Sequence, residues 1–224
     1  FIEKRQKEKA APAAAPAVPV ESAAEFKENT PRERLIAQEA ERTGDEFTVE
    51  AIVKLDSIDT AASVRTIASH WTGGKDNVES FGWSIGVTGE KSRFKPRNLI
   101  IQLVGEDENR NIAYEPVASD LRIELGVTYH IAVKVSCAAH EVVFRVQQVD
   151  KPNAPVLTSA VPHHVRVGLD RGAANLVIGG VHKRAPSHHW DGRIEAARIT
   201  RGLVPDAALS AKPETWKAPA LVTW

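Results

Sequence analysis

The chain has 224 residues, of which 29 are basic and 29 acidic, so its formal net charge is zero. Charges that cancel provide no overall field to draw the chain to nucleic acid or to an anionic membrane. No apolar run approaches the ~20 residues that cross a bilayer, so we expect no membrane insertion within this segment. The length suits one large β-sandwich with terminal extensions.

Cys137 is the single cysteine, which excludes an internal disulfide and any site with several cysteine ligands. It ends a strand-like run that begins at Ile131, and this context predicts a small buried thiol rather than a nucleophile. The chain starts at Phe1 and contains no methionine, so we expect it to be a processed product or a fragment.

The first part of the chain is compositionally distinct from the rest. Residues 1–28 combine a mixed-charge run with an alanine- and proline-rich tract, which predicts a semi-rigid linker without a core. Thr30 suits a helix cap, Pro31 suits the first helical position, and Gly44 suits a helix end. We therefore expect a short amphipathic helix over residues 29–44.

Beyond this segment the apolar periodicity changes to two, which is typical of strands with one buried face. Turn-forming residues separate the runs, and no helix of crossover length lies between them. This pattern predicts an all-β, antiparallel β-sandwich over residues 45–201, followed by a C-terminal extension over 202–224. The inward sets are Phe47, Val49, Ala51, Val53 and Leu55; Trp83, Ile85 and Val87; Leu99, Ile101 and Leu103; Ile131, Val133 and Val135; and Val142, Phe144 and Val146.

Several motifs occur along these strands in a fixed order: Phe47-Thr-Val-Glu-Ala51, Arg65-Thr-Ile-Ala-Ser69, Gly82-Trp-Ser-Ile-Gly86, Tyr129-His-Ile-Ala-Val133 and Asp191-Gly-Arg-Ile194. In this order they resemble the laminin-G-like branch of the concanavalin-A-like superfamily. The resemblance covers roughly 150 residues and implies a jelly-roll sandwich. It does not define a function, because such folds host lectins, adhesion modules, hydrolases and spacers.

A narrower resemblance involves the segment Glu90–Val104 together with Gly82-Trp83 and Trp190-Asp-Gly192. These residues are similar to the laminin-G-like segment of large planctomycete surface or periplasmic proteins that also carry cytochrome-c-like domains. The resemblance implies an exported module, periplasmic or at the cell surface, whose partners are other domains or subunits of a larger assembly.

A retaining glycoside hydrolase on this fold needs two carboxylates ~5.5 Å apart, with acidic residues at even spacing along a strand. The chain has no Glu-x-Asp-x-x-Glu run, and the strand acids Glu50 and Glu195 each stand alone. Glu50 lies at an outward position, where we expect a solvated carboxylate. We therefore expect no catalytic residues and no enzymatic activity.

The superfamily resemblance also implies a structural Ca²⁺ held by oxygen ligands from the start of the first strand and from the last strand. The matching positions are Asp45 or Glu46, the carbonyl of Gly73, and Asp191. The alternative for Asp191 is a simple turn before the glycine that follows it. No cofactor is required by the sequence.

Lys91, Arg93, Lys95 and Arg97 occupy alternate positions, so an extended conformation would place them along one edge, ~6.6 Å apart. That spacing suits sulfates, phosphates or carboxylates on an anionic glycan. The alternative is that these cations protect an edge strand from aggregation or pair with nearby acids.

Trp71 and Trp190 are the candidates for flat surfaces that stack on a sugar, and burial in the core is the alternative for each. His188 and His189 beside Trp190, with His182, could form a transition-metal site. Adjacent strand residues point in opposite directions, however, so we expect polar loop histidines instead.

Three functions remain open from the sequence. The first is a non-catalytic interaction or scaffolding module of a larger exported protein, favoured by the linker-like ends. The second is a lectin-like carbohydrate-binding module, with Trp71, Trp190 and the basic row as its contacts. The third is a glycoside hydrolase, which lacks its carboxylate pair.

Overall fold

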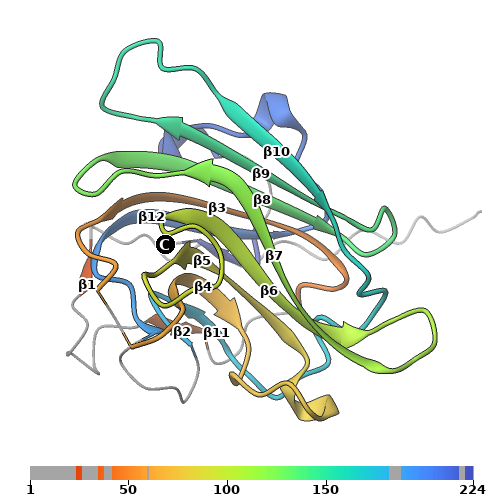
Figure 1. Cartoon of the computed structure of the whole chain (residues 1–224). Coiled ribbons are helices and arrows are strands. Elements are labelled where there is room, and N and C mark those ends of the chain that lie inside the picture. The colour runs from red at the N-terminus through yellow and green to blue at the C-terminus, as the bar shows by residue number, and fades with distance from the viewer. Residues whose placement is uncertain are drawn as a thin grey trace, which may run out of the picture.

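The computed structural model describes residues 24–26, 35–37, 42–59, 61–181, 188–216 and 220–223. Within these residues, two antiparallel sheets pack face to face as a jelly-roll β-sandwich (Figure 1). Sheet A has seven strands in the order β1-β12-β3-β8-β9-β10, with β13 also paired to β12. Sheet B has six strands in the order β2-β11-β4-β5-β6-β7. The predicted fold class is confirmed.

Thirteen strands are found in the described part of the chain, together with short 3-10 turns at Val78–Ser80, Asp206–Ala208 and Pro213–Thr215. No helix in that part is both long and apolar enough to span a bilayer. The strands are β1 (Ala24–Phe26), β2 (Leu35–Ala37), β3 (Glu46–Leu55), β4 (Val64–His70), β5 (Gly82–Thr88), β6 (Asn98–Glu106), β7 (Ile112–Arg122), β8 (Thr128–Ser136), β9 (Glu141–Gln148), β10 (Leu157–Pro162), β11 (Leu176–Ile178), β12 (Gly192–Arg201) and β13 (Val222–Thr223).

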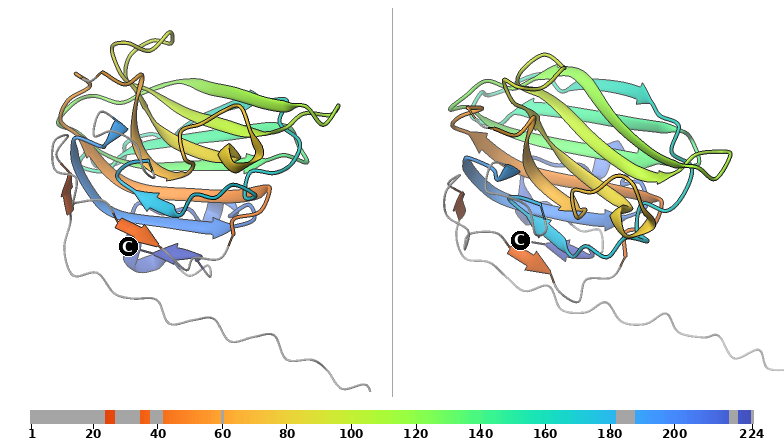
Figure 2. Two further views of the ribbon diagram at one scale, coloured as in Figure 1. Left: turned by 90° about the horizontal axis from the view of Figure 1, so that it is seen from below. Right: turned by 60° about the horizontal axis from the view of Figure 1, so that its bottom comes forward.

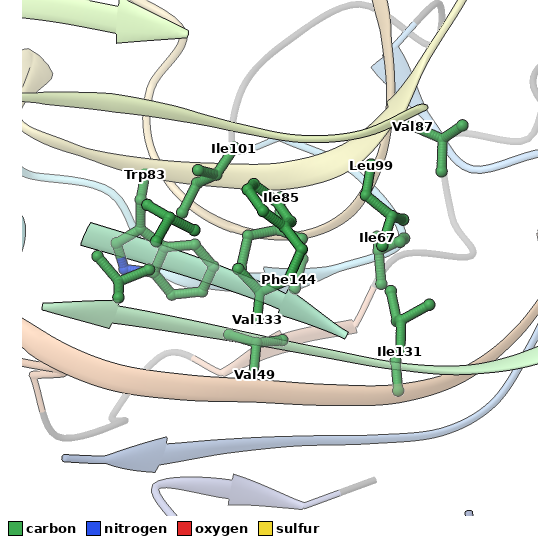
Figure 3. Packing of buried hydrophobic residues seen from close by; sticks show 14 of the residues in the cluster. Val49, Ile67, Trp83, Ile85, Val87, Leu99, Ile101, Ile131, Val133 and Phe144 are labelled. Atoms are coloured by element: carbon green, nitrogen blue, oxygen red, sulfur yellow. The ribbon is translucent and has the colours of Figure 1, made fainter. Parts of the chain in front are cut away.

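The core lies between the two sheets, which Figure 2 shows as stacked layers. All five inward sets predicted from the alternation belong to one buried cluster. Side chains from sheet B, such as Ile85 and Ile101, meet Val49, Val133 and Phe144 of sheet A (Figure 3). Phe47 and Trp83 stack across the sheets with ring centroids 4.7 Å apart. Period-two alternation therefore predicted which face of each strand is buried.

The helix predicted over residues 29–44 is wrong where the structure can be compared with it. Leu35–Ala37 form strand β2, antiparallel to β11, and residues 42–44 are not helical. A single short helix is marginally stable by itself, whereas the open edge of β11 supplies backbone hydrogen-bond partners. The other residues of this segment lie outside the described part of the chain.

Two further short strands come from the predicted terminal segments. Ala24–Phe26, within the predicted linker, pair as β1 with β12, and the rest of residues 1–28 lies outside the described part. Val222–Thr223 of the C-terminal extension pair as β13 with the same strand. Short segments from both predicted terminal regions therefore pair with β12 of sheet A.

Candidate functional site

A pocket of about 280 Å³ lies on the outer face of sheet B, the face turned away from the core. The alternation of β6 creates this face, because Leu99, Ile101 and Leu103 point into the core while Ile100 and Gln102 point out. The lining comes from the start of β4, the β5–β6 connection (residues 89–97), β6 and β7. The lining residues are Ser63, Val64, Ser92, Arg93, Phe94, Ile100, Gln102, Tyr114 and Pro116.

β5 contributes no side chain to the pocket, although it lies between β4 and β6 in the sheet. Gly86 is its residue opposite Ile100, and a Cβ there would lie 2.0 Å from the carbonyl oxygen of Arg65. Glycine is therefore required at this position for the bulged backbone of β4 to approach β5.

Polar groups converge on the pocket from two neighbouring strands. Gln102 is 5% exposed, and its Nε2 donates to the Tyr114 hydroxyl at 2.7 Å. Its Oε1 has no hydrogen-bond partner in the described residues. A buried acceptor without a partner is unfavourable by about 1–3 kcal/mol, so this oxygen is suited to accept from a bound molecule or water.

Aromatic rings form the walls beside these groups. Tyr114 is 37% exposed and stacks on Trp71 with ring centroids 6.2 Å apart. Trp71 is itself 4% exposed, and its Nε1 donates to the carbonyl of Gly74 at 2.6 Å. The predicted role of Trp71 as an exposed sugar platform is therefore wrong. Trp71 supports Tyr114, which presents the accessible ring.

The basic row does not adopt the predicted extended conformation. Its chain turns, because Ser92 N donates to the Gly89 carbonyl at 3.2 Å and Arg97 has a φ of 71°. Arg97 pairs with Glu124, and Lys91 and Lys95 do not line the pocket. Arg93 alone of the four does so, with its guanidinium 4.9 Å from the Phe94 ring centroid. Because the β5–β6 connection turns, its side chains do not alternate between two sides as they would along a straight strand.

The other predicted aromatic and histidine candidates lie away from this pocket. Trp190 is 0% exposed and belongs to the core, where its Nε1 donates to the carbonyls of Lys54 and Arg193. Trp190 therefore offers no surface to a sugar. His189 is buried, His188 is half-buried, and His182 lies outside the described residues.

The predicted calcium ligands are not brought together. Asp45 precedes β3, whereas Asp191 lies beside the other end of β3, with its carbonyl accepting from Asp56 N at 2.8 Å. A strand rises about 3.3 Å per residue, so these two acids are roughly 30 Å apart. In an antiparallel pair the start of the first strand meets the end of the last, Arg201, rather than its beginning.

Both acids at the start of β3 already have other partners. Asp45 Oδ1 accepts from the backbone of Gly168 and Leu169, and Glu46 Oε1 accepts from Ser136 Oγ. Gly73 lies in the loop after Trp71, with a φ of 83°. No cluster of three or more His, Cys, Asp or Glu suited to a metal is found among the described residues. The predicted ligand set thus does not fit a Ca²⁺ ion.

Part of the outer face of sheet A is covered by the C-terminal part of the chain. Val204 and Leu209, from the C-terminal segment (residues 203–216), pack on Ala132 of β8. Beneath this cover Glu50 is 1% exposed, which corrects the expectation of a solvated carboxylate. Its outward position was predicted correctly, but the C-terminal segment excludes water from it.

Glu50 is held by two cationic or polar side chains and one amide. Arg198 donates to Glu50 Oε2, His130 Nε2 lies 3.3 Å from Oε1, and Ser210 N donates to Oε1 at 3.3 Å. Burial tends to raise the pKa of Glu50, but the contacts with His130 and Arg198 hold this pKa below its ordinary value. These contacts make Glu50 a buried structural anion.

Of the nine residues that line the pocket, the sequence interpretation singled out only Arg93. It missed Phe94, Gln102 and Tyr114, which supply the aromatic rings and the amide. Gln102 was detectable as the one amide within the apolar run from Leu99 to Val104. Tyr114 was harder to find, because β7 is an edge strand with few buried residues and contains Pro116.

No family model matches the sequence, and no protein of curated function matches it. Among solved structures, the chain is similar to a native heptameric SAP-like pentraxin from Limulus polyphemus. The two share 17% identity with a TM-score of 0.56, over 91% of this chain and 86% of the pentraxin. The chain thus has a β-sandwich fold similar to that of this pentraxin.

The chain is also similar to tailspike protein 2 of bacteriophage CBA120. Its enzymatically active domain aligns with a TM-score of 0.55 and 11% identity, over 85% of this chain and 28% of that domain's chain. The full-length tailspike aligns with a TM-score of 0.58 and 11% identity, over 90% of this chain and 26% of the tailspike. The chain therefore spans about a quarter of the tailspike. At these identities the likeness concerns the fold alone.

Proposed function

We propose that the protein is a non-catalytic carbohydrate-binding module whose ligand site is the pocket on the outer face of sheet B. The observation that supports this most directly is the composition of the lining. Accessible aromatic rings from Phe94 and Tyr114 lie beside an unsatisfied amide oxygen of Gln102 and the cation of Arg93. Apolar walls with a few convergent polar groups are typical of small-molecule sites.

The same lining argues against hydrolysis at this site. It contains no aspartate or glutamate, so neither a nucleophile nor a general acid of the usual glycosidase kind is present in the pocket. The buried carboxylate of Glu50 lies on the other sheet, beneath the C-terminal segment. A sugar in the pocket would be bound and released unchanged.

A glycan array tests the proposal, with neutral, carboxylated and sulfated glycans probed by the wild type and by Tyr114→Ala. Tyr114 is partly exposed, so its removal should leave the sandwich folded while weakening binding by about tenfold or more. Ile112→Ala is the matched control, because Ile112 is an exposed apolar residue of the same strand that does not line the pocket. Binding that is unaffected by Tyr114→Ala, or release of new reducing ends, would contradict the proposal.

A scaffolding module is the second candidate, and the pairing of short segments that flank the sandwich supports it. β1 and β13 both add to β12, and β2 adds to the edge of β11. Such a module would be held between other domains of a larger exported protein. The planctomycete setting with cytochrome-c-like domains is supported by the sequence resemblance alone. Absence of binding to every glycan on the array would favour this candidate.

A further inference from the structure

Arg93 is the only charged residue that lines the pocket. Its guanidinium lies over the Phe94 ring and, within the described residues, forms no salt bridge. The other three cations of the row do not line the pocket. The pocket therefore offers one planar cation, held against an aromatic ring, to whatever it binds.

Gln102 and Tyr114 add hydrogen-bonding groups of both kinds. Gln102 Oε1 is a buried acceptor without a partner. The Tyr114 hydroxyl accepts from Gln102 Nε2, so its own hydrogen is left to donate, and no acceptor for it is found in the described residues. A sugar hydroxyl both donates and accepts, so one ring hydroxyl could satisfy both groups.

We propose that the pocket binds a single sugar residue that carries a carboxylate, such as a uronic acid. Arg93 receives the carboxylate, Gln102 and Tyr114 bind ring hydroxyls, and the Tyr114 or Phe94 ring contacts the sugar's apolar face. The proposal rests on the proposed carbohydrate-binding function and specifies its ligand. A planar guanidinium matches a carboxylate through two parallel hydrogen bonds.

The size of the pocket favours one residue over a polymer lying along a row of cations. Its volume of about 280 Å³ is just below the ~300–1,000 Å³ that is typical of ligand sites. One cation balances one carboxylate, whereas it would neutralise only half the charge of a doubly charged phosphate. Recognition through a single ionic contact also predicts a weak dependence of affinity on salt.

Calorimetric titration of glucuronic acid, glucose and glucose 6-sulfate into the protein tests this inference. For the wild type we expect glucuronic acid to bind about tenfold or more tightly than glucose, with glucose 6-sulfate weaker than glucuronic acid. Arg93→Ala should abolish the preference for the acid and leave glucose binding within about twofold of the wild type. Lys95→Ala is the matched control, since it removes one positive charge from the same connection without touching the pocket, and it should leave the preference intact.

The failures of the two proposals can be distinguished. Equal affinities for glucose and glucuronic acid, both weakened by Tyr114→Ala, would contradict the proposed specificity for a carboxylate. The proposed carbohydrate-binding function would still be supported. Tighter binding of glucose 6-sulfate, or a loss with Lys95→Ala equal to that with Arg93→Ala, would also contradict the proposed specificity. Absence of binding by every sugar at millimolar concentration would overturn both. Thermal melting of each variant establishes that it is folded, and Arg93 and Lys95 are both exposed.

Discussion

Arg198 donates two hydrogen bonds to one carboxylate oxygen of Glu50, through Nε at 2.8 Å and through Nη2, where both side chains are 1% exposed. The pair joins β12 to β3 on the outer face of sheet A, and the ring of Trp216 lies 5.0 Å from the guanidinium. An ion pair in this position couples the C-terminal segment to the sheet.

Removal of one partner should be strongly destabilising, because the other charge would remain buried without compensation. We expect Glu50→Ala to lower the free energy of unfolding by about 3–5 kcal/mol, measured by urea denaturation. The double variant Glu50→Leu with Arg198→Met should recover much of this loss. Asp206→Asn is the control, since it breaks the exposed pair with Lys134 and should change stability by less than about 1 kcal/mol. Equal effects of Glu50→Ala and Asp206→Asn would contradict this account of the ion pair.

The C-terminal segment should contribute directly to stability through Leu209, which is buried against Ala132 and Val204. We expect Leu209→Ala to destabilise the protein by about 2–3 kcal/mol, the lower part of the usual range for such truncations. Leu203→Ala provides the control, because Leu203 lies in the same segment but is exposed. Equal rates of limited proteolysis of the C-terminal segment in the wild type and in Leu209→Ala would contradict the packing of this segment on sheet A.

Stability should fall on mild acidification because of two buried histidines. Burial lowers the pKa of His70 and of His163 below the ordinary value of 6.5, although hydrogen bonds to the Leu169 and Ser136 carbonyls act in the opposite direction. The unfolded chain therefore binds protons first as the pH falls through 6.5. The stabilisation is fully present above that pH and is lost progressively below it.

Urea denaturation at pH 7.5, 6.5 and 5.5 measures this effect, with a limiting slope of about 1.4 kcal/mol per pH unit for each histidine. His163→Gln keeps a donor for the Ser136 carbonyl and should reduce the slope. Glu50, whose pKa is lowered, should add a second decline only below about pH 4.5. A rise in stability between pH 7.5 and 5.5 would contradict the expected sign.

Cys137 should be unreactive in the folded protein. Burial, and then the negative charges of Asp45 and Glu46, raise the pKa of this thiol to about 12, so almost no thiolate exists at neutral pH. We expect a thiol reagent to modify it only after denaturation, and at pH 8 the rate should track unfolding. Rapid modification of the native protein would show that the end of β8 opens more readily than its burial indicates.

The sequence predicted the sandwich because the core-facing residues of its central strands are apolar and recur at every second position. The residues between them in β4, β5 and β6 are buried as well. The sequence did not predict β7 and β10, because these are edge strands whose side chains are largely exposed. Apolar alternation therefore predicted the buried central strands but not the exposed edge strands.

The candidate site was only partly predictable. Trp71 and Arg93 were recognised as residues of interest, but their roles depend on the bend of the β5–β6 connection and on the stacking of Tyr114. The calcium prediction required two ends of an antiparallel pair to meet, which the register forbids. The burial of Glu50 depends on the C-terminal segment, whose contact through Ser210 is 160 residues away in sequence, and local periodicity carries no information about such a contact.

The central claim is that the pocket on sheet B, and not another surface, binds sugar. Backbone amide NMR spectra recorded during titration with glucose and with glucuronic acid test this most directly. The account predicts amide chemical-shift changes confined to Ser63–Val64, Ser92–Phe94, Ile100–Gln102 and Tyr114–Glu115. Shifts that cluster on sheet A, or an unchanged spectrum at saturating sugar, would contradict it.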